Sequence, residues 1–150
     1  AIVAVILALI INPSIMLHVD YASLLTFTCF FIFISDIQQI PFIVTLISKT
    51  MFSEHSVFLT SIISSQFISN VPSTILIGRF TNYAEALFLG SNIGGFGSLV
   101  GSMANMLVFK SFVENGTVSK RKFFWMFSVL EFAGLILLTI LGWIVLDFVI

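Results

Sequence analysis

Two stretches of small polar residues and glycines contain the residue types that could bind a solute. The first runs from Ser69 to Thr74, and the second runs from Ser91 to Asn105. Neutral hydroxyl and amide groups can bind ions without the cost of burying a charged side chain. Unpaired N–H groups at the start of a half-helix attract an anion, and free carbonyl groups at its end suit a small cation such as sodium. These residues therefore indicate recognition of a solute and its counter-ion.

The composition places these stretches in a membrane protein. Hydrophobic residues make up 59% of the chain and charged residues 9%, whereas a soluble domain carries about 25% charged residues. The net charge of -1 argues against a nucleic-acid partner. Because a spanning helix needs about 20 apolar residues, the 150 residues suffice for a single membrane domain.

The hydropathy pattern predicts an all-α membrane protein in which transmembrane helices accompany a re-entrant helical hairpin and a broken helix. The lipid bilayer is thus an expected partner. A dozen residues is too short to cross it, so one segment is expected to lie at the interface. The expected segments are spans at 1–17 and 21–35, an interfacial helix at 40–51, the hairpin at 56–80, the broken helix at 85–109 and a last span at 123–149.

The hairpin is predicted from the polar centre of an otherwise apolar, uncharged segment. Asn70 and Pro72 favour a turn, so two half-helices are expected to meet between Ser69 and Pro72. One full span with a kink at Pro72 is the alternative.

The broken helix is predicted from Gly94, Gly95, Gly97 and Gly101, which lie close together in an apolar segment. Each glycine costs a helix about 1 kcal/mol relative to alanine. Backbone freed from helical hydrogen bonds is tolerated at membrane depth where it is buried in protein or lines a watery cavity. Alternatively, Gly97 and Gly101 form a GxxxG pair that serves helix packing.

These patterns assign two overlapping groups of candidate residues. The expected substrate-binding residues are Ser69, Asn70, Val71, Pro72, Ser73, Thr74, Ser91 and Asn92. The expected ligands of a coupling ion, with sodium as the possible metal, are Ser69, Asn70, Gly94, Gly95, Gly97, Ser98, Ser102 and Asn105.

Glu131 lies outside these groups, and Ser98 within them is also a possible nucleophile. Glu131 lies within the last predicted span and is either a proton relay or, as we favour, a hydrogen-bonding partner of a neighbouring helix. Ser98 is not part of a GxSxG motif, and no histidine falls within a predicted span to act as its base. We therefore expect neither an enzyme nor a cofactor other than the coupling ion.

The two motifs together resemble a known family. Ser69-Asn70-Val71-Pro72, followed by the Gly-rich stretch from Ser91 to Ser102, is similar to the second-half signature of the ion transporter superfamily. That superfamily holds citrate-transporter-like proteins, divalent anion–sodium symporters and arsenite permeases. The resemblance covers the chain from about Asp20 to its end.

The resemblance implies that this chain is the second of two inverted repeats, whose first half lies outside it, and that the whole protein is a homodimer. It also implies a substrate site between two hairpin tips, with sodium or protons as coupling ions. Two positions depart from the family pattern: the dicarboxylate branch typically has Thr where this chain has Val71, and the arsenite and antiporter branches often have Asp where it has Ser69.

The sequence therefore predicts part of a secondary active transporter that moves a small anion, such as a di- or tricarboxylate, with sodium or protons. An arsenite permease or sodium/proton antiporter of the same superfamily is one alternative, and a membrane packing or assembly protein without transport is the other. The protein is expected in the cell membrane. The basic loop at 110–122 should be cytoplasmic and the C-terminus outside, because positive loops stay inside.

Overall fold

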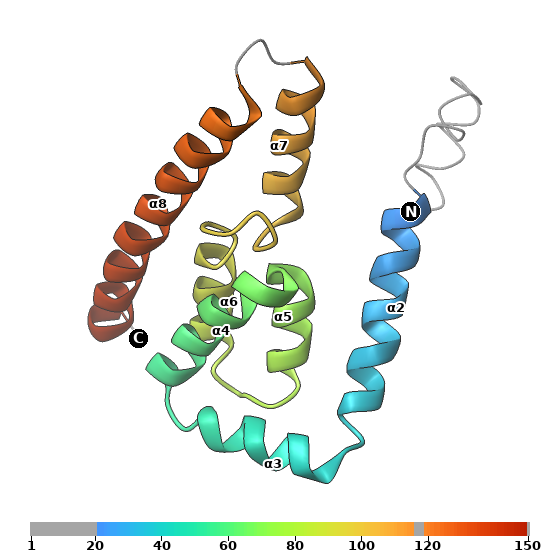
Figure 1. The fold of residues 1–150 in the computed structure, drawn as a ribbon. Helices are drawn as coiled ribbons and strands as arrows, with labels where there is room; N and C mark the ends of the chain where they lie inside the picture. Colours follow the sequence, from blue (N-terminus) through green and yellow to red (C-terminus); the bar gives the residue numbers. More distant parts are fainter. Residues whose placement is uncertain (1–20, 116–118, 150) are drawn as a thin grey trace, which may run out of the picture. The chain divides into compact units, whose positions relative to one another are not determined.

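The computed structural model describes residues 21–115 and 119–149, and all regular secondary structure in these ranges is helical. The prediction of an all-α chain is confirmed for these residues (Figure 1). The chain divides into two compact units, Ala1–Phe33 and Ile34–Ile150. The span predicted at 1–17 lies outside the described residues.

The helices follow the predicted segments closely at most boundaries. They are α2 (Tyr21–Ile37), α3 (Pro41–Thr50), α4 (Glu54–Ile68), α5 (Asn70–Gly78), α6 (Ala84–Ile93), α7 (Met103–Asn115) and α8 (Lys120–Val149). The prediction of a loop at 110–122 was wrong, because Lys110 lies within α7 and Lys120 begins α8. Polar residues such as lysine and glutamate are good helix formers, and no glycine or proline precedes Gly116 to end α7.

Local sequence signals explain where α3 and α4 begin. Pro41 occupies the first turn of α3, where its missing N–H group costs no hydrogen bond. Ser53 caps α4: its Oγ accepts a hydrogen bond from the Ser56 N–H at 3.2 Å, and the Ser56 Oγ accepts one from the Ser53 N–H at 2.9 Å. This reciprocal capping box satisfies two N–H groups that a helix start leaves unpaired.

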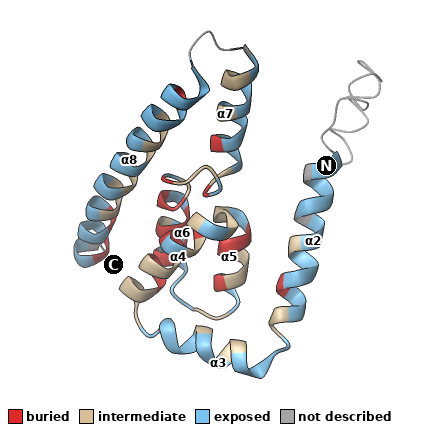
Figure 2. Ribbon diagram, viewed as in Figure 1, coloured by how far each residue is buried: buried red, intermediate tan, exposed pale blue. Residues whose placement is uncertain are grey.

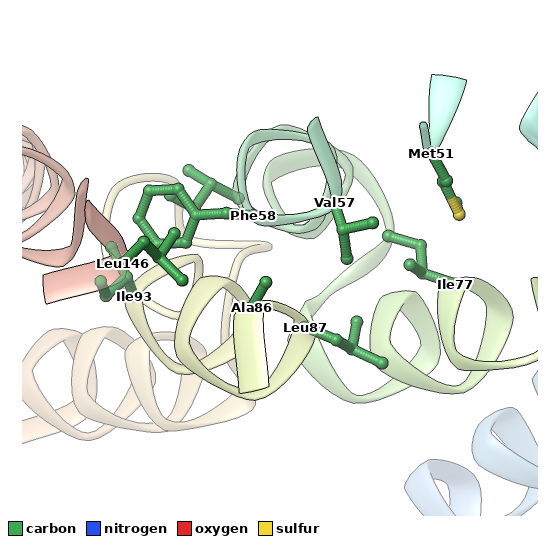
Figure 3. Close-up of a cluster of buried hydrophobic side chains, with 9 residues drawn as sticks. Met51, Val57, Phe58, Ile77, Ala86, Leu87, Ile93 and Leu146 are labelled. Atoms are coloured by element: carbon green, nitrogen blue, oxygen red, sulfur yellow. The ribbon is translucent and has the colours of Figure 1, made fainter. Parts of the chain in front are cut away.

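Helix α4 is the centre of the packing in the larger unit, since it contacts α3, α5, α6 and α8. Buried residues concentrate on α4, α5 and α6 (Figure 2). Phe58 and Val57 on α4 are fully buried. They belong to a core cluster that also contains Met51, Ile62, Ile77, Ala86, Leu87, Ile93 and Leu146 (Figure 3).

Two glycines let α6 approach α4 closely. A Cβ atom added to Gly90 would lie 2.6 Å from the Phe58 carbonyl oxygen, and one added to Gly94 would lie 2.7 Å from the Ser65 side chain. Gly90 lies within α6, and Gly94 follows that helix as its C-cap residue. Gly97 and Gly101, the GxxxG pair considered above, lie in the loop after α6, so they do not form a packing pair within a helix.

Helix α8 has 30 residues, which corresponds to a length of about 45 Å. Among the described residues, Lys120–Phe148 is the one uninterrupted helix long and apolar enough to cross a membrane. The pair Leu24–Ile37 and Pro41–Thr50 passes the same test only when counted as one bent span. Most large side chains of α8 are exposed (Figure 2), as a lipid-facing or partner-facing helix requires.

One side-chain pair ties the end of α8 to the start of α4. His55 Nε2 lies 2.8 Å from Asp147 Oδ1, and the His55 ring lies against the Trp143 ring at a centroid distance of 4.3 Å. Asp147 therefore holds two helix ends together.

Candidate functional site

The Gly-rich segment between α6 and α7 forms a compact loop from Gly94 to Ser102. Short turns build it: the Gly95 N–H donates to the Asn92 carbonyl at 3.2 Å, and the Phe96 N–H donates to the Ile93 carbonyl at 3.0 Å. Gly97 has a φ of 104°, a conformation that L side chains rarely adopt. The loop thus needs glycine at Gly97 for its backbone path.

Gln66, on α4, fixes this loop from the side. Its Nε2 donates to the carbonyl oxygens of Gly94 and Phe96, both at 2.9 Å. Its Oε1 accepts from the Ser98 N–H at 2.8 Å, and the Ser98 Oγ donates to the Gln66 carbonyl at 2.9 Å. One amide side chain therefore satisfies three backbone groups that the broken helix leaves without helical partners.

Asn105 and Ser102 fix the loop from the start of α7. Asn105 Nδ2 donates to the Gly95 carbonyl at 2.9 Å and to the Ser98 carbonyl at 3.2 Å. The Ser102 Oγ accepts from the Ala104 N–H at 3.2 Å, which caps the helix start. The loop is therefore held by side chains from both the helix beside it and the helix after it.

The connection between α4 and α5 is tied to the same loop. Ser69 joins the two helices at φ 71°, the one positive φ among the described non-glycine residues. Such a backbone is strained for serine by about 1–3 kcal/mol and tends to occur at functional sites. The Asn70 N–H donates to the Gly101 carbonyl at 2.9 Å. This backbone hydrogen bond thus joins the start of α5 directly to the Gly-rich loop.

The turn is shorter than the sequence indicated. We expected it to extend from Ser69 to Pro72, but α5 already begins at Asn70. Pro72 lies in the first turn of that helix, where a proline is tolerated. Helices α4 and α5 pack against each other, and Ser64 Oγ and Ser73 Oγ lie 2.5 Å apart across the contact. The alternative of one continuous, kinked helix is therefore not what the structure shows.

A polar pocket of about 330 Å³ lies where these helix ends meet. The starts of α5 and α7 contribute to its wall, as do the end of α6 and the middle of α8. Its lining consists of Asn70, Asn92, Gly95, Phe96, Ser102, Ala104, Asn105 and Glu131. Two helix starts with positive dipole ends and one helix end with a negative dipole end thus face a pocket that also holds a carboxylate.

The structure brings five of the predicted site residues together in this pocket: Asn70, Asn92, Gly95, Ser102 and Asn105. The remaining predicted residues do not line it. Ser73 is buried against Ser64, and Thr74 Oγ1 donates to the Asn70 carbonyl at 2.6 Å. Ser91 is buried, and its Oγ has no hydrogen-bond partner within the part of the chain that the structure describes.

Other predicted residues have structural positions. Val71 is exposed and Pro72 is buried in α5. Ser69, Gly94, Gly97 and Ser98 shape the backbone of the turn and the loop. Their assignment as ligands stays a prediction.

The carbonyl groups of the loop are largely used within the chain. Those of Gly94 and Phe96 accept from Gln66, and those of Gly95 and Ser98 accept from Asn105. A carbonyl oxygen has two lone pairs, so a cation at these atoms would share them with the amide donors. The side-chain oxygens of the pocket are therefore more available to a cation than these carbonyl oxygens are.

Sequence reasoning did not identify Gln66, Phe96 and Ala104 as parts of the site. Gln66 is the one residue with a long amide side chain in the uncharged segment 56–78. A single such residue in an apolar segment could have indicated that its side chain binds other parts of the chain. Glu131 was expected to bond a neighbouring helix, and that role stays a prediction. Its Oε2 is buried and has no hydrogen-bond partner among the described residues.

Two curated proteins are similar to this chain. The inner membrane protein YbiR of Escherichia coli (strain K12) is 33% identical over 133 residues, which cover 88% of this chain and 34% of YbiR. The uncharacterized transporter MJ0456 of Methanocaldococcus jannaschii is 32% identical over 120 residues, which cover 80% of this chain and 33% of that protein. No family model and no solved structure matches the chain.

The chain spans about a third of the length of these relatives. One relative is named as an inner membrane protein and the other as an uncharacterized transporter.

Proposed function

We propose that this chain is part of a secondary active transporter that moves a small anion, such as a di- or tricarboxylate, coupled to sodium or protons. The observation that carries the proposal is the pocket in which Asn70, Asn92 and Asn105 come together from three helix ends. Discontinuous helices whose ends meet at a polar site are a common way in which transporters bind substrates and coupling ions.

The helix starts supply the anion preference. Helices α5 and α7 both begin at the pocket, and the positive ends of their dipoles attract a negative group. The side-chain amide groups of Asn70 and Asn92 supply hydrogen-bond donors of the kind that carboxylates accept. A small carboxylate anion therefore fits the chemistry of the wall.

The membrane setting follows from the apolar surface and from the relatives. We propose that α8 spans the bilayer, that α4 and α5 form the re-entrant hairpin, and that α6 and α7 are the halves of the broken helix. A first repeat outside this chain would supply the facing half of the site, and the transporter would be a homodimer. The segment between α7 and α8 would face the cytoplasm and the end of α8 the outside.

Uptake measurements with pocket variants test this function. The intact protein, combined with its first repeat where that is a separate chain, is reconstituted into liposomes. Uptake of ¹⁴C-succinate and ¹⁴C-citrate is then measured under a sodium gradient and under a proton gradient. We expect Asn70→Ala and Asn92→Ala each to lower uptake by about tenfold or more, because a hydrogen bond to a charged group contributes about 1.5–3 kcal/mol.

The matched control is Asn82→Ala, the same change at an exposed residue between α5 and α6, and it should transport normally. Normal uptake by both pocket variants would show that the site is assigned wrongly. Sodium/proton exchange or arsenite movement without carboxylate uptake would point to the antiporter or arsenite branch instead.

A further inference from the structure

Four of the six lysines and arginines of the chain lie where α7 ends and α8 begins. We call them the basic patch, which consists of Lys110, Lys120, Arg121 and Lys122. All four are exposed, and no ion pair involves them in the part of the chain that the structure describes. In the sequence, Glu114 is the one carboxylate between Glu85 and Glu131. The basic patch therefore carries positive charge that the described residues do not neutralise.

The three cations of α8 lie at an unfavourable position in their helix. Lys120, Arg121 and Lys122 occupy its first turn, and no acidic residue lies in that turn. Because the start of a helix carries a partial positive charge, anions stabilise it and cations there do not. Neighbouring cations also repel one another. An anion from outside the chain would offset both costs.

Stacked aromatic rings bring the two parts of the basic patch together. The Phe112 ring of α7 lies against the Phe123 ring of α8 at a centroid distance of 3.6 Å. The Phe109 ring lies 6.0 Å from the rings of Phe123 and Phe124. Lys110 stands between Phe109 and Phe112 in α7, next to the start of α8 (Figure 1). The basic patch is therefore built from two helices that contact each other.

Two tryptophans indicate how deep the basic patch lies in a bilayer. Trp125 and Trp143 are 18 residues apart on α8, which corresponds to about 27 Å and matches a hydrocarbon core of about 30 Å. Tryptophan favours the two membrane interfaces. With Trp125 at one interface, Lys122 lies about 4.5 Å and Lys120 about 7.5 Å further out along the helix. The headgroup layer adds about 5–7 Å on each side, so these cations lie at the depth of the lipid phosphates.

We propose that the basic patch binds the phosphate group of an anionic lipid, such as phosphatidylglycerol. Lysine and arginine donate charge-assisted hydrogen bonds to phosphate oxygens, and basic residues next to a spanning helix are attracted to anionic lipids. The exposed rings of Phe124 and Trp125 follow the patch in α8 and can contact the glycerol and upper acyl chains. Free phosphate has no apolar part for these rings. The inference goes beyond the proposed function, because lipid binding does not depend on the transported solute.

Native mass spectrometry of the intact protein in detergent measures this binding directly. The protein is titrated with phosphatidylglycerol and, separately, with the neutral lipid phosphatidylcholine. We expect phosphatidylglycerol to bind at least tenfold more tightly. Replacing Lys120, Arg121 and Lys122 together by glutamine should weaken phosphatidylglycerol binding by about tenfold or more, since each basic residue near anionic lipid contributes about fivefold.

The matched control replaces the two other basic residues of the chain, Lys49 and Arg79, by glutamine. Both are exposed and lie outside the basic patch, so this variant should bind phosphatidylglycerol as the unmodified protein does. Equal affinity of the unmodified protein for the two lipids would overturn the proposal, and so would unchanged phosphatidylglycerol binding by the triple variant.

Thermal unfolding in detergent separates a lipid site from a site for soluble phosphate. Phosphatidylglycerol should raise the melting temperature of the unmodified protein and not that of the triple variant. Inorganic phosphate should raise neither, and protection by phosphate alone would refute a lipid site. Without added lipid, the triple variant should melt at the same temperature or higher, because its first turn no longer opposes the helix dipole.

A single replacement on α7 keeps the test decisive if the triple variant does not fold. Lys110→Gln changes the basic patch without altering the start of α8. It should weaken phosphatidylglycerol binding by about fivefold and leave phosphatidylcholine binding unchanged. If it bound phosphatidylglycerol with the unmodified affinity, the assignment of the patch to an anionic lipid would be wrong.

Discussion

Replacing Gln66 by leucine is expected to abolish uptake and to lower the melting temperature of the protein markedly. The leucine has a similar volume but no polar atoms, so the carbonyls of Gly94 and Phe96 and the Ser98 N–H lose their partner. Each buried polar group left unpaired costs about 1–3 kcal/mol. The bonds that remain, such as those from Asn105, go to other atoms of the loop and do not replace these three, so the loss should displace the pocket wall. Uptake in liposomes and thermal unfolding in detergent measure the two effects.

The control for this change is Gln39→Leu, which makes the same replacement at an exposed residue between α2 and α3. It should leave both uptake and melting temperature close to those of the unmodified protein. If Gln66→Leu behaved like Gln39→Leu, Gln66 would not be holding the loop.

A single added methyl group at Gly90 should also destabilise the protein. The Cβ of Gly90→Ala would lie 2.6 Å from the Phe58 carbonyl oxygen and 2.9 Å from the Ser61 Cβ. Neither atom belongs to a flexible side-chain end, so α6 has to move away from α4. Overpacking of this kind costs about 1–3 kcal/mol, and we expect a lower melting temperature. Uptake should fall as well, because α6 carries Asn92 into the pocket.

Gly78→Ala provides the comparison for Gly90→Ala. At Gly78 the added Cβ would meet the Leu87 Cδ2 at 3.2 Å, and that methyl group can rotate away. Its melting temperature should therefore change little. Equal destabilisation by the two alanines would show that close packing of α6 on α4 is not the reason that Gly90 is needed.

The sequence was sufficient to locate the two helix interruptions, because their causes are local. Four glycines in a short apolar stretch end α6, and the small polar residues after Ile68 separate α4 from α5. The extent of the first turn was overestimated, since Pro72 was interpreted as a turn residue. A proline is equally compatible with the first turn of a helix, and local sequence does not distinguish these two positions.

The contacts across the fold could not be predicted from local patterns. Gln66 contacts residues about thirty positions further along the chain, such as Ser98, and Glu131 reaches the pocket from α8. Hydropathy indicates that a polar residue in an apolar segment needs a partner, but it does not identify that partner. The sequence alone also does not show that Gly90, and not Gly97, lies in a helix and packs against α4.

The central claim is that polar residues from interrupted helices form a water-accessible pocket within a membrane. It is tested most directly by cysteine accessibility in the intact protein, after Cys29 and any other cysteine have been replaced by serine. Asn92→Cys, in the pocket, is compared with Leu137→Cys, on the exposed apolar surface of α8. We predict that a charged, membrane-impermeant thiosulfonate reagent modifies the first and not the second in liposomes, and that sodium slows the reaction at the first. Failure to modify either position, or equal modification of both, would contradict the account.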